Sequence, residues 1–350
     1  MLGLDGPRGT TPPELAAVVA LCDAIFAPET RHMGSVFPTL FAPSNGEWLR
    51  TFWDGDRVVS HVGVWLGRVQ AGERTLGVAH IGAVCTLPEY RNRGLAGALL
   101  ADLLPRLVAA EADLLLISGH RRLYQSLGAR PFGVLLRYRV PRQALEDLPL
   151  PRLGTRVPRG VDELAGLQAV EPYRYLRSAE DWSLLAPAKG YLPPVREPGP
   201  LQGMGSLVAV DGEEPVAYLL LGRPRREGDV GVLPVDEFGG ERLGVLAALV
   251  QAMELRGAAL AELRVRPGDV DLRRYLEAAG LRAEIQHQQG TGRILRACAF
   301  PPLHPWDPDP SLPAAPLGSG EEADAAAALT ERLLGPGGLE LPRNDGLNYI

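Results

Sequence analysis

One order of elements occurs twice along this chain, and this repeat limits the folds that the chain can adopt. Each copy contains a β-type run, a long apolar helix, a short strand and a short helix that ends at a glycine, Gly128 in one copy and Gly280 in the other. Residues 88–90 before the first long helix also resemble residues 235–238 before the second. A repeat of this length indicates a duplication, and 350 residues are more than one hydrophobic core usually organises. The sequence therefore predicts two α/β domains.

The domain boundaries follow from strand and turn signals. Three β-type runs over 48–86 predict an antiparallel meander. A helix over 91–111 follows, in which Pro105 predicts a kink or a break, and a strand over 131–140 is expected to close the first domain. Prolines and weak periodicity after Pro141 indicate a linker. We expect a first domain over 1–142, a linker over 143–160, a second domain over 161–300 and a Pro-rich C-terminal extension over 301–350, with a short helix over 321–334.

Composition excludes several classes of protein. Thirty-six Lys and Arg against 42 Asp and Glu give a formal charge of −6, which offers no electrostatic reason for nucleic-acid binding. Cys22, Cys85 and Cys298 lie far apart without a CxxC pair, so neither a disulfide framework nor a metal site is indicated. No run reaches the roughly 18–20 apolar residues of a membrane helix, and no signal peptide is evident. We therefore expect a cytoplasmic protein that contacts neither nucleic acid nor membrane.

The segment before the first long helix has the composition of an anion site. Residues 91–97, Arg-Asn-Arg-Gly-Leu-Ala-Gly, stand directly after a strand and directly before the helix. Gly94 and Gly97 allow close approach of a ligand and unusual backbone angles. The helix start offers free N–H groups and a partial positive charge, to which Arg91 and Arg93 add full charges. The segment therefore predicts a pyrophosphate site, and a turn with surface arginines is the alternative.

The same segment resembles a known family. Residues 84–99 read VCTLPEYRNRGLAGAL and are similar to the acetyl-CoA motif of the GNAT N-acetyltransferase superfamily, in which Arg or Gln is followed by two residues, Gly, one residue, and Gly or Ala. The resemblance implies tandem GNAT-like acyl-CoA N-acyltransferase domains, each an α/β unit with a mixed, mostly antiparallel sheet and flanking helices. It also implies a set of residues that contact acetyl-CoA. The pantetheine arm would pair with Val84, Cys85 and Thr86, and the pyrophosphate would lie on Arg91, Asn92, Arg93, Gly94, Leu95, Ala96 and Gly97.

Catalytic groups are implied by the same resemblance. Tyr124, on the short helix after the next strand, would donate a proton to the departing CoA thiolate, and packing of its ring is the alternative. His80 stands eleven residues before the motif, where several family members carry a catalytic glutamate. Its neutral imidazole could accept a proton from the amine, and a structural role is the alternative. Gly119 and His120 are implied as further CoA contacts.

A tandem subgroup, the enhanced-intracellular-survival type, resembles the chain more fully. Its members pair an intact GNAT domain with a degenerate one, and the terminal carboxylate of the chain serves at the active site. The resemblance would give that role to Ile350, at the end of an apolar tail. The tail after Phe300 is only 50 residues, shorter than the third domain of that subgroup.

The second copy departs from the motif at its defining positions. In the alignment of the two copies, Gly239 replaces Arg91, Arg242 replaces Gly94, and Leu276 replaces Tyr124. We therefore expect the second domain to bind no CoA and to act as a scaffold or as one wall of the acceptor cleft.

Together these residues predict an N-acetyltransferase that transfers an acetyl group from acetyl-CoA to a primary amine by direct attack. The acceptor would be a small molecule or a peptide amine, and no metal is predicted. The alternative is a catalytically weak or inactive acyl-CoA-binding or interaction protein. A P-loop or dinucleotide site is disfavoured, because the loop lacks Gly-Lys-Ser/Thr and follows an antiparallel meander. The acceptor, the base (His80, the Ile350 carboxylate or a water relay), the oligomeric state and any ligand of the second domain stay open.

Overall fold

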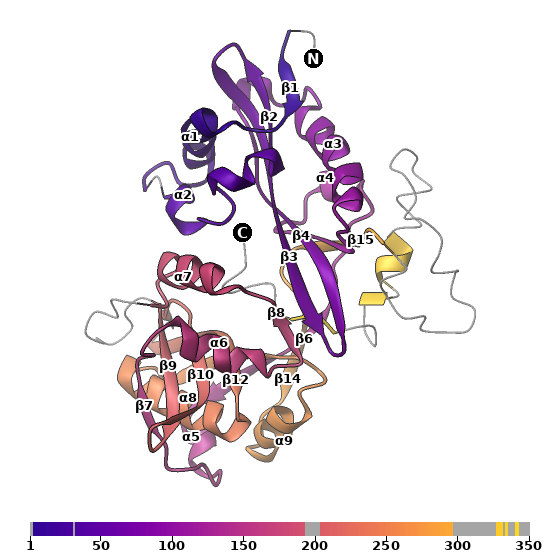
Figure 1. Ribbon diagram of the computed structural model, residues 1–350. Coiled ribbons are helices and arrows are strands. Elements are labelled where there is room, and N and C mark those ends of the chain that lie inside the picture. Colours follow the sequence, from indigo (N-terminus) through magenta and orange to yellow (C-terminus); the bar gives the residue numbers. More distant parts are fainter. Residues whose placement is uncertain are drawn as a thin grey trace.

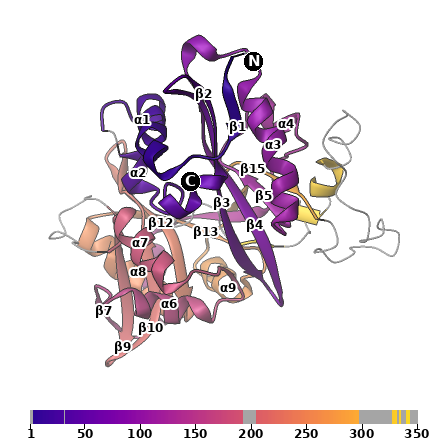
Figure 2. The ribbon, with the colours of Figure 1, turned by 45° about the horizontal axis from the view of Figure 1, so that its top comes forward.

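The computed structural model describes residues 3–30, 32–192, 204–296, 327–331, 333–334 and 340–342. In these ranges the chain forms two α/β bodies side by side, each built on one mixed sheet with helices packed against it (Figures 1 and 2). We call the body that contains residues 49–86 the first body and the body that contains residues 205–240 the second body. The predicted fold class, a tandem of mixed sheets with flanking helices, is confirmed.

The first sheet is built on an antiparallel meander of three strands. These are β2 (Leu49–Asp54), β3 (Arg57–Ala71) and β4 (Arg74–Thr86). Both connecting turns contain a glycine with positive φ, 55° at Gly55 and 63° at Gly72, as tight hairpin turns favour. β1 (Asp5–Arg8) pairs antiparallel with β2 at the edge of the sheet. The predicted meander is confirmed.

Helices cover both faces of this sheet. α3 (Leu95–Ala109) packs a stripe of leucines on one face, and α1 (Leu15–Phe26) packs on the other (Figure 1). α3 begins four residues later than predicted, because residues 91–94 form a loop. The helix continues through Pro105, which is exposed, so the break that this proline could have caused is absent.

The central strands of the first sheet part from each other at one end. β5 (Leu114–Ile117) lies parallel to β4, but the two strands pair only up to Ile81 and Ile117. β4 continues to Thr86 and stays paired with β3, so its other edge has no strand partner within the described ranges. α4 (Arg122–Gln125) follows β5. The opening between β4 and β5 therefore lies where α3 begins.

The second sheet repeats this plan. Its antiparallel meander consists of β9 (Gly205–Asp211), β10 (Glu214–Leu221) and β12 (Val230–Gly240). β13 (Leu260–Val265) lies parallel to β12. α8 (Arg242–Arg256) connects these two strands, and α9 (Val270–Ala278) follows β13, as α3 and α4 do in the first body. The element order that recurs in the sequence thus recurs in space.

Each sheet also contains at least one strand from the far side of the division predicted after residue 142. β6 (Val134–Pro141), expected to close the first domain, pairs instead with β13 and with β14 (Ala283–His287) of the second sheet. Its Tyr138 and Val140 are buried in the second core. In return, β15 (Thr291–Ile294) pairs antiparallel with β5 and completes the first sheet. The division after residue 142 stays a prediction, and strand pairing crosses it in both directions.

The remaining elements are short. They are α2 (Met33–Val36), α5 (Arg142–Glu146), α6 (Val161–Ala169), α7 (Ala179–Ala188), β7 (Gly154–Arg156), β8 (Tyr173–Tyr175), β11 (Arg225–Glu227) and three 3-10 turns, η1 (Pro12–Glu14), η2 (Pro43–Trp48) and η3 (Pro88–Tyr90). The linker expected over 143–160 thus contains α5 residues and all of β7, which pairs with β9. β8 pairs with the far end of β3.

The C-terminal extension is described only in part. Residues 327–331 and 333–334 are helical and fall within the helix predicted over 321–334, of which residues 321–326 lie outside the described ranges. In the part of the chain that the structure describes, no helix is both long enough and apolar enough to cross a membrane.

Candidate functional site

A cavity of about 360 Å³ opens where β4 and β5 part. Its walls come from the end of α1, the end of β4, the loop before α3, the first turn of α3 and the region of α4. The structure brings these predicted site residues together in its lining: Val84, Cys85, Thr86, Arg91, Asn92, Gly94, Leu95, Ala96, Gly97 and Tyr124. Ile25 and Phe26 of α1 also line the cavity and were not expected there, since their sequence signal is only that of an amphipathic helix.

The end of β4 presents an open backbone edge to this cavity. On one side it is held by β3, where Ser60 pairs with Thr86 and His61 with Cys85. The other edge carries no strand in the described ranges, because β5 pairs with β4 no further than Ile81. An extended ligand with amide groups can add hydrogen bonds to such an edge in the way that a strand does.

The start of α3 is open to the same cavity. Gly94 precedes the helix with a φ of 76°, and Asn92 also has a positive φ, 60°. The first N–H groups of a helix have no acceptor one turn back, and the hydrogen bonds of α3 begin with Ala98 N–H to Gly94 O at 3.0 Å. A Cβ added at Gly94 would meet nothing within 4 Å, and one at Gly97 would meet only a leucine methyl at 4.0 Å. The helix start therefore offers free donors and room for an anion.

The arginines near this start take different orientations. Arg91 lines the cavity, and its Nε donates to the carbonyl of the last β4 residue at 3.2 Å. Arg93 is not in the lining: it lies over the ring of Tyr90, 4.7 Å from the centroid, and donates to the carbonyl of Glu89 at 2.8 Å. Arg121 lines the cavity from the start of α4. Positive charge at the cavity thus comes from Arg91 and Arg121, while Arg93 contacts residues of the loop itself.

Tyr124 closes one side of the cavity. Its side chain is 6% exposed, and its hydroxyl has no hydrogen-bond partner among the described residues. Burial raises the pKa of Tyr124 above its ordinary value, so the hydroxyl keeps its proton at neutral pH. Gly119 packs against this ring, since a Cβ there would lie 3.0 Å from Cε2. Neither Gly119 nor the exposed His120 is in the lining.

Of the two candidate bases, His80 is the one among the described residues, and it does not line the cavity. His80 is buried on the face of the sheet opposite α3, with its ring 5.4 Å from Trp65 and 5.5 Å from Tyr175. Burial lowers the pKa of His80 to about 3, so its imidazole is neutral and weakly basic at physiological pH. Ile350 lies outside the described residues. The catalytic roles of both residues stay predictions.

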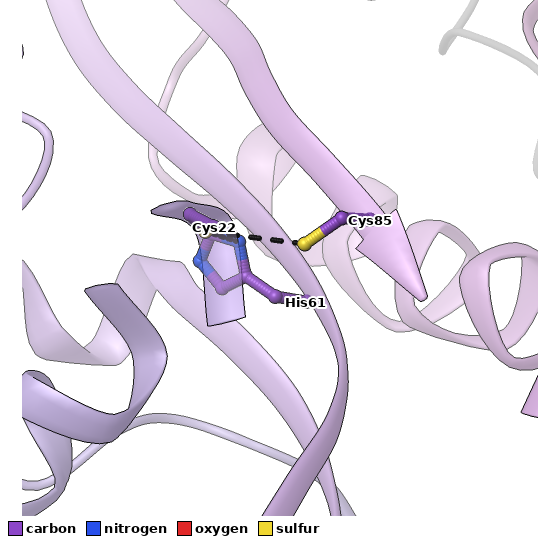
Figure 3. Close-up of side chains that lie close together, drawn as sticks. All are labelled: Cys22, His61 and Cys85. Carbon is purple, nitrogen blue, oxygen red and sulfur yellow. Dashed lines mark hydrogen bonds between the residues drawn. The ribbon is translucent and has the colours of Figure 1, made fainter. Parts of the chain in front are cut away.

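Beside the cavity lies a cluster that the sequence did not predict. Cys22 of α1, His61 of β3 and Cys85 of β4 converge in the core (Figure 3). Cys22 Sγ lies 3.9 Å from Cys85 Sγ and 3.5 Å from His61 Nδ1. The hydrogen bond between the two thiols lowers the pKa of Cys85 and raises that of Cys22. Separations of 39 and 63 residues leave no local motif that could reveal the cluster.

In the second body, side chains of the chain itself fill the corresponding opening. Glu171 accepts hydrogen bonds from the Gly240 N–H at 2.9 Å and from both terminal nitrogens of Arg242 at 2.8 Å. Arg242 also contacts Asp269 at 3.0 Å. The remaining cavity is about 60 Å³. Glu171 therefore occupies the space beside the end of β12 and the side chain of Arg242, the first residue of α8.

The alignment of the two copies needs a correction at this point. Eight residues, 87–94, separate β4 from α3, whereas Glu241 alone separates β12 from α8. Gly239, expected in the loop, lies inside β12. Arg242, expected at the place of Gly94, is the first residue of α8. The second copy thus lacks a loop of this length, so Gly239 and Arg242 do not occupy the places of Arg91 and Gly94.

Comparison with protein families identifies the first body. Residues 7–132 match a family model described as an acetyltransferase (GNAT) domain. This stretch contains the open edge of β4, the loop, the start of α3 and Tyr124. It is a GNAT acetyltransferase domain, as the resemblance of the motif implied. Among curated proteins, none matches the chain significantly.

Solved structures extend the likeness to both bodies. The chain is similar to a GCN5-related N-acetyltransferase from Anabaena variabilis, with 14% identity over 83% of this chain and 73% of that chain and a TM-score of 0.61. The chain is also similar to Eis1 from Mycobacterium abscessus, with 13% identity over 84% of this chain and 74% of that chain and a TM-score of 0.61. A GCN5-related N-acetyltransferase from Kribbella flavida shares 18% identity over 85% of this chain and 71% of that chain, with a TM-score of 0.59. These likenesses show a shared fold.

Proposed function

We propose that this protein is an N-acetyltransferase that transfers an acetyl group from acetyl-CoA to a primary amine by direct attack. The family of the first body is one of acyltransferases. The observation that carries the finer proposal is the single cavity that joins an open strand edge, an anion-ready helix start and a buried protonated tyrosine. Each of these three features matches one part of acyl-CoA chemistry.

Binding would use the backbone more than side chains. The N–H groups at the start of α3 would hold the pyrophosphate, with Arg91 as a charged partner. Glycine at positions 94 and 97 leaves the space that such a group needs. The open edge of β4 at Val84–Thr86 would pair with the amides of the pantetheine arm. This arrangement would place the thioester beside the point where β4 and β5 part.

Two kinds of group would assist the transfer reaction: backbone N–H groups of β4 and the hydroxyl of Tyr124. Nucleophilic attack by the amine forms the new C–N bond and a tetrahedral intermediate, whose oxyanion the N–H groups of β4 would stabilise. Tyr124 would then donate its proton to sulfur as the C–S bond breaks. Its raised pKa supports this role, because a general acid must still hold its proton when the thiolate forms. Holding both reactants in one cavity lowers the entropic barrier.

The proton of the attacking amine needs a separate acceptor. His80, the Ile350 carboxylate and a water relay are the candidates. The pKa of about 3 for His80 disfavours it as a direct acceptor at neutral pH, which favours the other two. The second body would contribute a wall, since its α7 contacts the first body where Lys189 Nζ lies 3.9 Å from the ring centroid of Phe37.

Calorimetric titration of acetyl-CoA, followed by an assay of thiol release with a panel of amines, tests the proposal. The panel should contain small diamines, an aminoglycoside-like polycation and a short peptide with a free N-terminus. We expect one binding site per chain and thiol release that depends on the amine. Binding without thiol release for any amine would favour the alternative, an inactive acyl-CoA-binding protein. Absence of binding would refute both.

A further inference from the structure

Three side chains that bind metals in many proteins meet beside the cavity, each from a different element (Figure 3). Cys22 comes from α1, His61 from β3 and Cys85 from β4. One ligand atom from each, the two sulfurs and a ring nitrogen, lie within 4.8 Å of one another. Across the described ranges of the chain, no other group of three or more His, Cys, Asp or Glu has this arrangement.

The separations fit a tetrahedral metal ion. Zinc lies about 2.3 Å from thiolate sulfur and about 2.0–2.1 Å from imidazole nitrogen, so ligands at tetrahedral angles are about 3.8 Å apart for two sulfurs and about 3.5 Å apart for sulfur and nitrogen. The observed separations are 3.9 Å between the sulfurs of Cys22 and Cys85 and 3.5 Å between Cys22 Sγ and His61 Nδ1. An ion could enter this space with little movement of the ligands.

The backbone directs these side chains to one point. Residues His61 and Cys85 are direct partners across β3 and β4, and side chains of such a pair lie on the same face of a sheet. A register shift next to this pair gives β4 one extra residue opposite β3, and Ala83 there has a φ of 52°. Bulges of this kind re-aim side chains near functional sites. α1 then brings Cys22 onto the same face.

The surroundings favour a thiophilic ion. Cys22 and His61 are fully buried and Cys85 is 5% exposed, among apolar neighbours such as Phe41, whose ring stacks on His61 at 6.1 Å. His61 Nδ1 also lies 2.9 Å from the carbonyl oxygen of Ala83. An ion at Nδ1 would replace the proton there, which would move to Nε2, a buried atom without a partner in the described structure. Two thiolates and an imidazole form a ligand set typical of zinc.

We propose that Cys22, His61 and Cys85 bind one zinc ion, with the fourth coordination position directed at the cavity that Cys85 lines. The ion would fasten α1 to β3 and β4 next to the open edge of β4. Entry and exchange would occur from the cavity, because Cys85 is the only one of the three in its lining. The metal site does not depend on the proposed acetyl transfer, since its ligands and its test involve no acyl group.

Cobalt titration of the full-length protein, kept reduced and freed of metal with a chelator, tests the site. We expect one Co²⁺ per chain, with the sulfur-to-cobalt charge-transfer band and the visible bands of a tetrahedral site, and displacement of cobalt by Zn²⁺. Cys22→Ser, His61→Gln and Cys85→Ser should each weaken binding at least about tenfold. Cys298→Ser, a change at the remaining cysteine, and His80→Gln, a change at a second buried histidine of the first sheet, should leave it unchanged. Equal binding by all five variants, or cobalt bands without sulfur character, would overturn the proposal.

A second measurement needs no variant and so does not depend on how well a variant folds. Zn²⁺ should slow alkylation of Cys22 and Cys85 in the wild-type protein about tenfold or more, as read by peptide mass spectrometry. Alkylation of Cys298 in the same sample should not change. Equal protection of all three cysteines, or none, would count against a site made by this cluster.

Discussion

Both sheets part between two central parallel strands, β4 and β5 in the first body and β12 and β13 in the second, and the two openings are filled differently. In the first body the start of α3 borders a cavity of about 360 Å³ with open space around Gly94. In the second body the cavity shrinks to about 60 Å³, because Glu171 accepts from the Gly240 N–H and from Arg242. The first opening can receive an external anion, and the second already holds an internal one.

The same arrangement of strands and helix can thus surround either an open helix start or an internal ion pair. In the second body a carboxylate binds the backbone at the end of β12 and the guanidinium of the arginine that begins α8. This carboxylate is the side chain of Glu171, on the segment after α6. The connection between β12 and α8 is a single residue, and the charges of Arg242 and Glu171 balance each other there.

Gly94→Glu would make the first body resemble the second. A carboxylate at this position should occupy the helix start, and we expect acetyl-CoA to bind about 10³-fold more weakly, or about 4 kcal/mol. The backbone strain of a side chain at a φ of 76° should cost only about 1–2 kcal/mol of stability. Gly212→Glu is the matched control, because Gly212 also has positive φ and open space but lies in a hairpin of the second body. Equal loss of binding in both variants, measured by calorimetry, would contradict the comparison.

Arg242→Met would break the internal ion pair of the second body. Glu171 and Asp269 would stay buried without their partner, and we expect a loss of about 3 kcal/mol in the free energy of unfolding. Arg142→Met removes an exposed pair with Glu254 and should cost less than about 1 kcal/mol. Urea unfolding measures both. No second acetyl-CoA site should appear, and a stoichiometry of two would show that the ion pair alone blocks the second opening.

Tyr124→Phe tests whether the cavity of the first body catalyses acetyl transfer in addition to binding acetyl-CoA. Loss of the proton donor should lower kcat about 10²-fold, or about 2.7 kcal/mol, and leave the affinity for acetyl-CoA unchanged. Tyr275→Phe, on the corresponding helix α9 of the second body, should change neither quantity. A parallel fall of affinity and kcat in the Tyr124 variant would assign this residue to packing instead.

His80 offers the smallest and most specific test, through pH. Its pKa is about 3 in the folded chain and about 6.5 ordinarily, so the unfolded chain binds more protons between these values. The contribution of His80 to the free energy of unfolding is therefore fully present above pH 6.5. It falls as the pH drops, by about 2 kcal/mol from pH 7 to pH 5. The variant His80→Leu removes this titration. Leucine is chosen because Leu233 takes the equivalent place in the second body: each residue stands one before the last residue of its strand that pairs with the parallel neighbour. Thermal melting of the wild type and of His80→Leu across this pH range measures the effect. An equal loss of stability in both proteins would show that groups other than His80 cause the pH dependence.

Local patterns predicted much of this molecule. The meander over 49–86, the short strand after the first long helix and the long helices follow from periodicity and turn residues. The gathering of most of residues 84–97 around one cavity follows from a motif that is contiguous in sequence. Such features depend on neighbours along the chain, so a single sequence contains them. The start of α3 was predicted four residues too early, because arginine is a good helix former and the sequence does not reveal the positive φ of Asn92 and Gly94.

Features that depend on tertiary pairing were not predictable in this way. β6 alternates as a strand in either sheet would, and nothing local says that its partner is β13 rather than β5. The cluster of Cys22, His61 and Cys85 joins residues far apart in the sequence. The filling of the second opening by Glu171 also needs the folded chain, since an acidic residue after a helix is common on surfaces.

The exchange of β6 and β15 has a consequence for how the protein is made and dissected. The first sheet is completed by a strand near residue 292, so a nascent chain must hold an unfinished sheet edge while the second body is synthesised. An exposed edge strand invites pairing with other chains, and such distant contacts slow folding. A fragment ending at residue 142 would expose β5 and carry an orphaned β6, so the smallest unit suited to expression on its own is the pair of bodies together.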